Sequence, residues 1–243
     1  MDASIITLAR KAKGLSIRQL SDLASIAPST TSRIERGEIS PTIETFTSLL
    51  NALGMTLALE ERPDLEAIRT ARWMAGDTTV GEPNPTWVDR YTKFGDADNI
   101  ASLCWRASRY ASFQFRACNE IRVRDLAAVR TVMNAPETDW VLTGSSAADI
   151  YSGNPAGTGQ FWVYAADPAA TVAAFAGVTV SSGGVRVLIA ELDETSEAGT
   201  VVAGKQRLAA PLQVVIDCFS GPGRMADQAW AVLERLGVNY ADR

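Results

Sequence analysis

The sequence predicts an α+β chain in two parts, an N-terminal all-α bundle followed by an α/β domain. Apolar residues at helical spacing, interrupted by Gly, Ser and Pro, fill residues 1–60 and predict four short helices. Residues 61–98 read as a helix and a linker containing Gly and Pro. Over residues 99–243, apolar strand-like runs alternate with helical segments, which predicts a sheet covered by helices.

The composition excludes several kinds of catalytic site. The 243 residues include no histidine, which excludes Ser-His-Asp and Cys-His catalysis in their usual forms and all His-ligated metal sites. Cys104, Cys118 and Cys218 form no C-x-x-C pair, so we expect small core residues in a reducing compartment. We expect no metal and no cofactor. No run is long and apolar enough for a membrane span or a signal peptide, so we expect a cytoplasmic protein that does not contact a membrane.

The net charge of −5 is unevenly distributed along the chain. Residues 1–59 hold six basic and five acidic residues, a net charge of +1, which leaves −6 for the rest. Because a DNA-binding module needs a local basic face and not a basic chain, the average charge does not exclude nucleic acid as a partner.

Caps and breaks define the four N-terminal helices. Gly14 is expected to end the first, Ser16 to cap the second, and Pro28 to begin the third, which Gly37 closes. The fourth begins at Pro41-Thr42 and stops at Gly54. The apolar stripe expected to face inward from the first helix comprises Ile5, Leu8, Ala9 and Ala12.

The phrases KGLSIRQLSDLA and STTSRIERGEISPTIETFTSLLNALG, within residues 3–59, resemble the lambda-repressor-like, or Xre-family, helix-turn-helix. The resemblance implies that the third helix enters the major groove of double-stranded DNA. It also implies an inverted-repeat operator bound by a homodimer, because one such module makes few base contacts.

The family pattern assigns candidate DNA-binding residues. Arg33 is expected to read guanine O6 and N7 with its planar fork, while Thr31 and Ile34 pack inward and Glu35 is structural. Phosphate contacts are expected from Arg18 and Arg36, with Lys11 and Lys13 adding distant charge. The remaining outward positions at the start of the third helix are Pro28, Ser29, Thr30 and Ser32, and their hydroxyls suit a base or a phosphate.

A second basic element is a further candidate. Residues 99–135 read as helix, basic strand and helix, a pattern that fits a small winged-helix-like unit. The alternative is that the arginines of this segment lie on a solvent-exposed face of the helix and strand. The arginines concerned are Arg106, Arg109, Arg116, Arg122 and Arg124.

The C-terminal part contains a glycine turn that invites an enzymatic reading. Strands are expected at WVLTG, FWVYA, VRVLIAE and LQVVIDCF, with helices capped by Ser145 and Asp167 and a closing helix at 223–237. The phrase LTGSSAAD resembles the opening of nucleotidyltransferases, whose chemistry needs two carboxylates on the next strand to hold magnesium. Only Asp167 is acidic there, so we expect no transferase activity and no enzyme.

The phrases WVLTGSSAADIY, FWVYAADP and PLQVVIDCFSGPGRMADQAWAVL resemble the C-terminal domain of AbiEi-type antitoxins of type IV toxin–antitoxin systems. The expected α/β domain is therefore degenerate nucleotidyltransferase-like or AbiEi C-terminal-like. That family commonly carries a winged-helix N-terminus, and this chain departs from it. The resemblance implies an autoregulatory antitoxin with a nucleotidyltransferase toxin encoded in the same operon. Two alternatives stay open: a regulator whose α/β domain senses a nucleotide or metabolite, and a nucleotide-processing enzyme with a DNA-targeting head.

Overall fold

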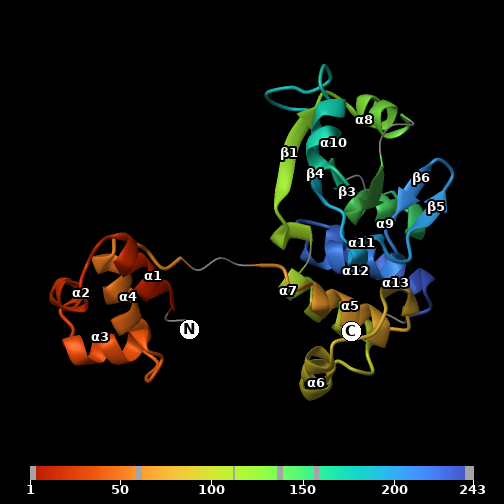
Figure 1. Ribbon diagram of the computed structural model, residues 1–243. Helices are drawn as coiled ribbons and strands as arrows, with labels where there is room; N and C mark the ends of the chain where they lie inside the picture. The colour runs from red at the N-terminus through yellow and green to blue at the C-terminus, as the bar shows by residue number, and fades with distance from the viewer. Residues whose placement is uncertain (1–3, 59–61, 112, 136–138, 156–158, 239–243) are drawn as a thin grey trace. The chain divides into compact units, whose positions relative to one another are not determined.

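The computed structural model divides the chain into two compact units, Met1–Glu60 and Glu61–Arg243 (Figure 1). It describes residues 4–58, 62–111, 113–135, 139–155 and 159–238. Each unit has its own apolar core. Among the described residues, the helices are all too short or too polar to cross a membrane.

The N-terminal unit consists of four short helices, and its caps follow from the sequence. These helices are α1 Ser4–Ala12, α2 Ile17–Ala24, α3 Pro28–Glu35 and α4 Ile43–Ala52. Ser16 caps α2 in a capping box with Gln19, and Thr42 caps α4 by accepting from the Thr45 amide. Gly14 has the positive φ of a helix C-terminus, as expected.

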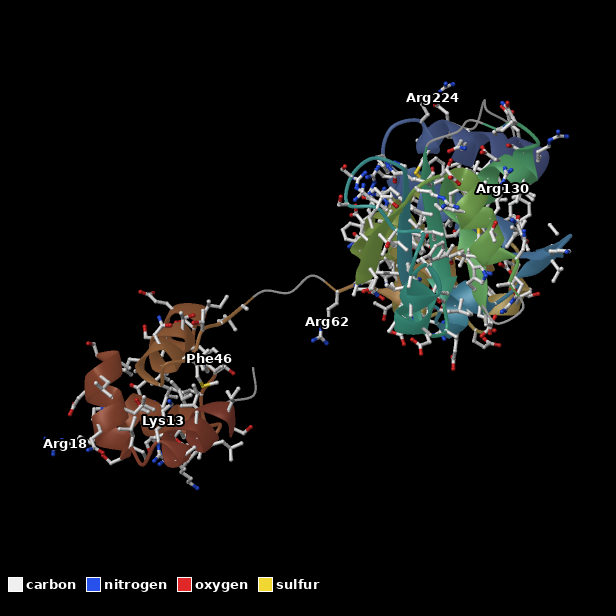
Figure 2. The ribbon with its side chains drawn as sticks, turned by 90° about the horizontal axis from the view of Figure 1, so that it is seen from above. Lys13, Arg18, Phe46, Arg62, Arg130 and Arg224 are labelled. Atoms are coloured by element: carbon white, nitrogen blue, oxygen red, sulfur yellow. The ribbon has the colours of Figure 1, made fainter. Side chains whose placement is uncertain are left out.

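Seven buried side chains form the core of this unit. All four helices contribute to it, and Leu53 directly follows α4. The seven are Ile6, Leu20, Ile34, Phe46, Leu49, Leu50 and Leu53. Phe46 lies between the helices (Figure 2). The expected inward stripe of α1 was wrong at Ile5, Leu8 and Ala12, which are exposed, Leu8 by 68%. Ile6 is the residue that α1 buries, because two overlapping apolar stripes occur on this helix and only the one that includes Ile6 faces the bundle.

The C-terminal unit contains one six-stranded mixed sheet in the order β1-β4-β3-β2-β6-β5. β1–β4, β3–β2 and β6–β5 pair antiparallel, whereas β4–β3 and β2–β6 pair parallel. The strands are β1 Cys118–Val123, β2 Trp140–Thr143, β3 Gln160–Ala165, β4 Val185–Glu191, β5 Val201–Ala203 and β6 Gln206–Leu208. The helices of this unit are α5 Leu65–Met74, α6 Pro85–Phe94, α7 Ile100–Ala111, α8 Leu126–Met133, α9 Gly144–Ser152, α10 Pro168–Ala174, α11 Glu194–Glu197, α12 Pro211–Ser220 and α13 Met225–Arg235.

Successive side chains of β2 and β3 point to opposite faces of the sheet. Thr143 and Trp162 are register partners on the face covered by α12, where the Thr143 hydroxyl donates to Asp217 of that helix at 2.6 Å. Leu142 precedes Thr143 and Phe161 precedes Trp162, so both lie on the other face of the sheet, where they line a cavity together with α8.

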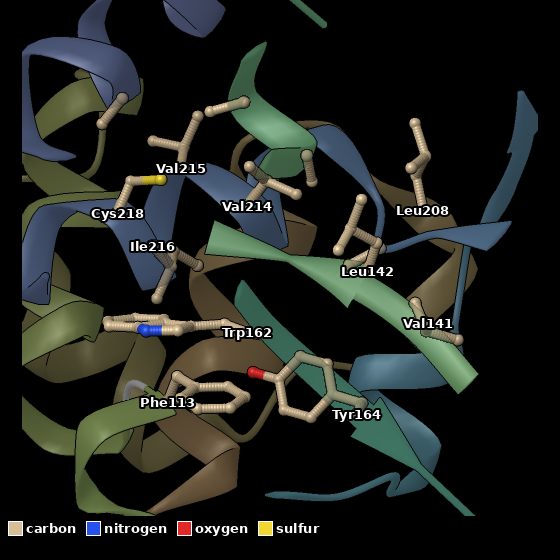
Figure 3. Packing of buried hydrophobic residues seen from close by; sticks show 14 of the residues in the cluster. Phe113, Val141, Leu142, Trp162, Tyr164, Leu208, Val214, Val215, Ile216 and Cys218 are labelled. Atoms are coloured by element: carbon tan, nitrogen blue, oxygen red, sulfur yellow. The ribbon is translucent and has the colours of Figure 1, made fainter. Parts of the chain in front are cut away.

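The α12 side of the sheet has an aromatic and polar centre (Figure 3). Phe113 stacks on Trp162 with ring centroids 4.8 Å apart. The fully buried Asp217 carboxylate accepts hydrogen bonds from Thr143, from the Tyr164 hydroxyl at 2.9 Å and from the Phe113 amide at 3.2 Å. Burial raises the pKa of Asp217, and these donors satisfy the carboxylate oxygens.

A buried arginine joins residues 61–98 to the rest of the C-terminal unit. Arg72 of α5 pairs with Asp77 at 2.6 Å and donates to the Thr195 and Ala198 carbonyls at 2.5 and 2.7 Å. This region, expected as a helix and linker, thus contributes α5 and α6 to the core of the unit.

Three further expectations are corrected. The segment LQVVIDCF is part of α12 and not a strand. Every residue from 212 to 219 is buried, and a helix that is buried on all sides shows no apolar periodicity in its sequence. Ser145 does not cap α9; the cap position is Thr143, and Ser145 is buried in the first turn. Residues 99–135 form no separate winged-helix-like unit, because β1 pairs with β4 in the large sheet and α7 packs on α5 and α12.

The cysteines are free thiols. Cys104 and Cys218 are buried, as expected, and Cys118 is half-buried. Burial raises the pKa of Cys104 to about 12 and that of Cys118 to about 11, so both thiols stay protonated and unreactive at neutral pH.

Candidate nucleic-acid interface

The turn between α2 and α3 sets the direction of α3. α2 ends at Ala24, and Ser25 adopts the left-handed conformation with φ 56°, while Pro28 is the first residue of α3. Only residues 25–27 separate the two helices. A connection this short fixes two helices at a steep angle and leaves one side of the second helix uncovered.

The inner side of α3 is held by three contacts. Ile34 and Thr31 are fully buried, and the Ser21 hydroxyl of α2 donates to Thr31 Oγ1 at 2.8 Å. At the end of α3, the Glu35 carboxylate accepts two hydrogen bonds from Arg10 of α1, at 2.6 and 2.7 Å. The inward placement of Thr31 and Ile34 and the structural pairing of Glu35 are as expected from the sequence.

The outer side of α3 carries the candidate base-contacting residues. Pro28 and Ser29 are exposed at its start, and Thr30 and Ser32 are half-buried. The Arg33 side chain is 55% exposed, so its guanidinium is accessible to a ligand. These five residues therefore belong to one helix whose opposite side is anchored in the bundle.

The candidate phosphate-binding residues lie on different elements. Arg18 is exposed on α2 and forms no ion pair within residues 4–58 (Figure 2). Arg36 follows the last residue of α3, is 57% exposed, and donates from Nη1 to Ser32 Oγ at 2.6 Å. The structure thus brings Ser32 and Arg36 together, whereas no contact joins Arg18 to them. Lys11 and Lys13 are also exposed.

Glu38 is the residue of this surface that the sequence reasoning did not identify. Its carboxylate accepts from Arg36 Nε at 2.6 Å and from Nη2 at 3.2 Å, and it lies 3.6 Å from Arg33 Nε. The hydrogen bond from Arg36 holds the pKa of Glu38 below its ordinary value and raises that of Arg36. One carboxylate therefore neutralises part of the positive charge of both arginines in the free protein. The available signal was an acidic residue two positions after Arg36, across the Gly37 turn.

A comparison with protein families finds a match within the N-terminal unit. Residues 6–59 match the helix-turn-helix family. This match supports an Xre-like helix-turn-helix at the N-terminus and, with it, a DNA-binding transcription regulator. No curated protein matches the chain. No solved structure matches it either.

The arginines of the middle segment do not form a single basic face. Arg116 is buried, pairs with Asp193 and lies over the Tyr164 ring. Arg106 pairs with Asp96 at 2.9 Å, and Arg124 pairs with the adjacent Asp125. Arg109 and Arg122 remain exposed. Arg116 thus has a structural role, because its side chain is 7% exposed and its charge faces Asp193.

The acidic residue considered for metal binding has a structural contact. Asp167 caps α10, and its Oδ1 accepts from the Ala170 amide at 2.9 Å, as the sequence predicted. Gly144, at the turn that resembles the nucleotidyltransferase opening, has φ +60° and faces the Trp162 ring, so any Cβ there meets that ring at 3.0 Å. Close packing of α9 on β3 explains this glycine.

Proposed function

We propose that the protein is a sequence-specific transcriptional repressor that inserts α3 into the major groove of an operator. The observation that carries this proposal is the asymmetry of α3. Its inner side is fixed by Ile34, by the Ser21–Thr31 hydrogen bond and by the Arg10–Glu35 pair, and its outer side presents Arg33. A rigid helix with an accessible arginine fork suits bidentate recognition of guanine O6 and N7.

The surrounding residues have different roles in this proposal. Ser29, Thr30 and Ser32 donate to base edges or phosphates, while Arg18 and Arg36 bind phosphates and set the register on the duplex. Glu38 must release its arginines when the phosphates arrive, because a carboxylate and a phosphate compete for the same donors.

We further propose that the protein binds as a homodimer to an inverted repeat. The net charge of +1 over residues 1–59 is small for one module, and one recognition helix contacts few bases. A two-fold dimer doubles both the positive charge and the number of base contacts, with half-sites about 10–10.5 base pairs apart.

The test is selection of bound duplexes from a random library, followed by mobility shift on the selected DNA and on the DNA upstream of the reading frame. The proposal expects an inverted repeat, a shift by the wild type, and a markedly weaker shift by Arg33→Ala. Equal binding of wild type and Arg33→Ala to the selected duplex would refute the assigned readout.

The finer proposal is an autoregulatory antitoxin without enzymatic activity. Its support is that the phrases resembling AbiEi-type antitoxins lie on elements that pack together, β2, α9, β3, α12 and α13. Co-expression with a nucleotidyltransferase encoded in the neighbouring reading frame tests it. The proposal expects growth to be restored by this protein. Continued growth arrest, or transfer of label from a nucleotide by this protein alone, argues against it.

A further inference from the structure

The sheet face that carries α8 is incompletely covered. A cavity of about 830 Å³ lies beside α8, with Leu142 of β2 and Phe161 of β3 among its lining residues. α8 contributes Leu126 and Arg130 to its wall, and α9 contributes Ser146 and Ile150. Cavities of roughly 300–1,000 Å³ are the size that encloses small molecules in proteins.

The lining is mainly apolar and partly open to solvent. Leu126 is 38% exposed and Ile150 is 43% exposed, although both line this cavity. A second hollow of about 440 Å³ shares Leu142 and Gln206 with it. Covering the accessible apolar side chains of the wall, Leu126 and Ile150, with an apolar group lowers the free energy.

Arg130 is the basic residue among those that line the cavity. Arg130 is exposed there and forms no ion pair with any residue that the structure describes, in a unit that holds 22 acidic and 17 basic residues over 61–243 (Figure 2). Asp149 also lines the cavity, and its Oδ1 accepts from Gln228 Nε2 of α13 at 2.6 Å, so an anion is expected on the Arg130 side of the cavity. α9 begins without a side-chain cap because the Thr143 hydroxyl donates to Asp217 instead.

We propose that this cavity binds a small organic anion, in which a carboxylate or phosphate is joined to an apolar or aromatic body. The anionic group pairs with Arg130 near the first turn of α9, and the body covers Phe161 and the exposed side chains of Leu126 and Ile150. This inference goes beyond DNA binding and does not depend on it.

The test compares two fluorescent probes of nearly the same shape on the full chain. 8-Anilinonaphthalene-1-sulfonate carries one negative charge, and N-phenyl-1-naphthylamine carries none. The wild type is expected to bind the sulfonate at one saturable site. Arg130→Gln weakens sulfonate binding about tenfold and binding of the neutral probe less than twofold, because only the sulfonate forms a charge-assisted contact.

Arg224→Gln is the matched control, since Arg224 is an exposed arginine of the same unit that does not line the cavity (Figure 2). It is expected to leave binding of both probes unchanged. Ile150→Trp places a larger side chain in the cavity and is expected to abolish binding of both probes. Circular dichroism checks that every variant keeps its fold. The proposal is overturned if the sulfonate shows no saturable binding, if Arg130→Gln weakens both probes equally, or if the two arginine variants behave alike.

Discussion

Removing the Glu38 carboxylate is expected to strengthen DNA binding. In the free protein this group accepts two hydrogen bonds from Arg36 and lies 3.6 Å from Arg33 Nε. Glu38→Gln removes the negative charge with almost no change in shape. It frees both arginines and also removes repulsion between the carboxylate and the DNA phosphates.

The exposure of the three side chains sets the size of the effect. They are all about half exposed, so solvent screens the ion pairs and each contributes little. We expect a gain of about two- to fivefold in affinity for each module. Because the proposed dimer contacts DNA with two modules, the factors multiply to roughly 4- to 25-fold for the complex.

Fluorescence anisotropy with a labelled selected duplex measures this change, at low and at high salt. Glu44→Gln is the matched control, because Glu44 is an exposed acidic residue in the first turn of α4 and its loss changes the net charge equally. It is expected to change the affinity by less than about twofold at moderate salt, since screening weakens charges that lie beyond the contact.

The reasoning fails if Glu38→Gln, with an unchanged melting temperature, binds the duplex no more tightly than the wild type. It also fails if Glu44→Gln gives the same gain, because the effect is then one of overall charge and not of the two released arginines.

Three other variants test the remaining arguments. Arg33→Ala should cost about 1–3 kcal/mol of DNA-binding free energy and relax selection at one base pair, as measured by anisotropy on a panel of single-site duplex variants. Ser25→Val should lower the free energy of unfolding by about 1–2 kcal/mol in urea titrations, whereas Ser25→Gly should be tolerated, because Ser25 has φ 56° and a β-branched residue is strained there. Asp77→Asn should destabilise the C-terminal unit at pH 7, because the buried Arg72 loses its partner. Burial alone raises the pKa of Asp77, but hydrogen bonds from Thr79 and Arg72 and the charge of Arg72 outweigh it, so the pKa is lowered in the folded state. The stabilisation by Asp77 is therefore present above the ordinary value of 3.8 and is lost as the pH falls through the folded pKa. The wild type and Asp77→Asn should thus converge in stability in acid, and a difference that persists there would contradict this ion pair's role.

The N-terminal helices were predictable because each boundary has its own local signal. Ser16, Pro28 and Thr42 occupy cap or first-turn positions, and Gly14 has the left-handed conformation that its place after a helix suggests. Ile5 and Leu8 were misplaced because a nine-residue helix with two overlapping apolar stripes does not reveal which stripe meets its neighbours.

Strands β2, β3 and β4 of the C-terminal sheet were predictable, whereas β5, β6 and the topology of the sheet were not. α12 was mistaken for a strand because it contains the β-branched run Val214, Val215 and Ile216 and is buried on all sides, so neither a period of two nor one of 3.6 is visible. The placement of β1 beside β4, over 60 residues later, depends on packing and not on local propensity. The role of Glu38 likewise becomes visible only when the turn at Gly37 brings its carboxylate onto two arginines.

Methylation interference on the selected duplex tests most directly whether α3 reads bases. A methyl group on guanine N7 lies in the major groove, where it blocks an arginine fork. The account predicts that methylation of a particular guanine in each half-site prevents binding by the wild type, and that Arg33→Ala binds weakly and without regard to that guanine. An identical interference pattern for the two proteins, or no interference at any guanine, would contradict it.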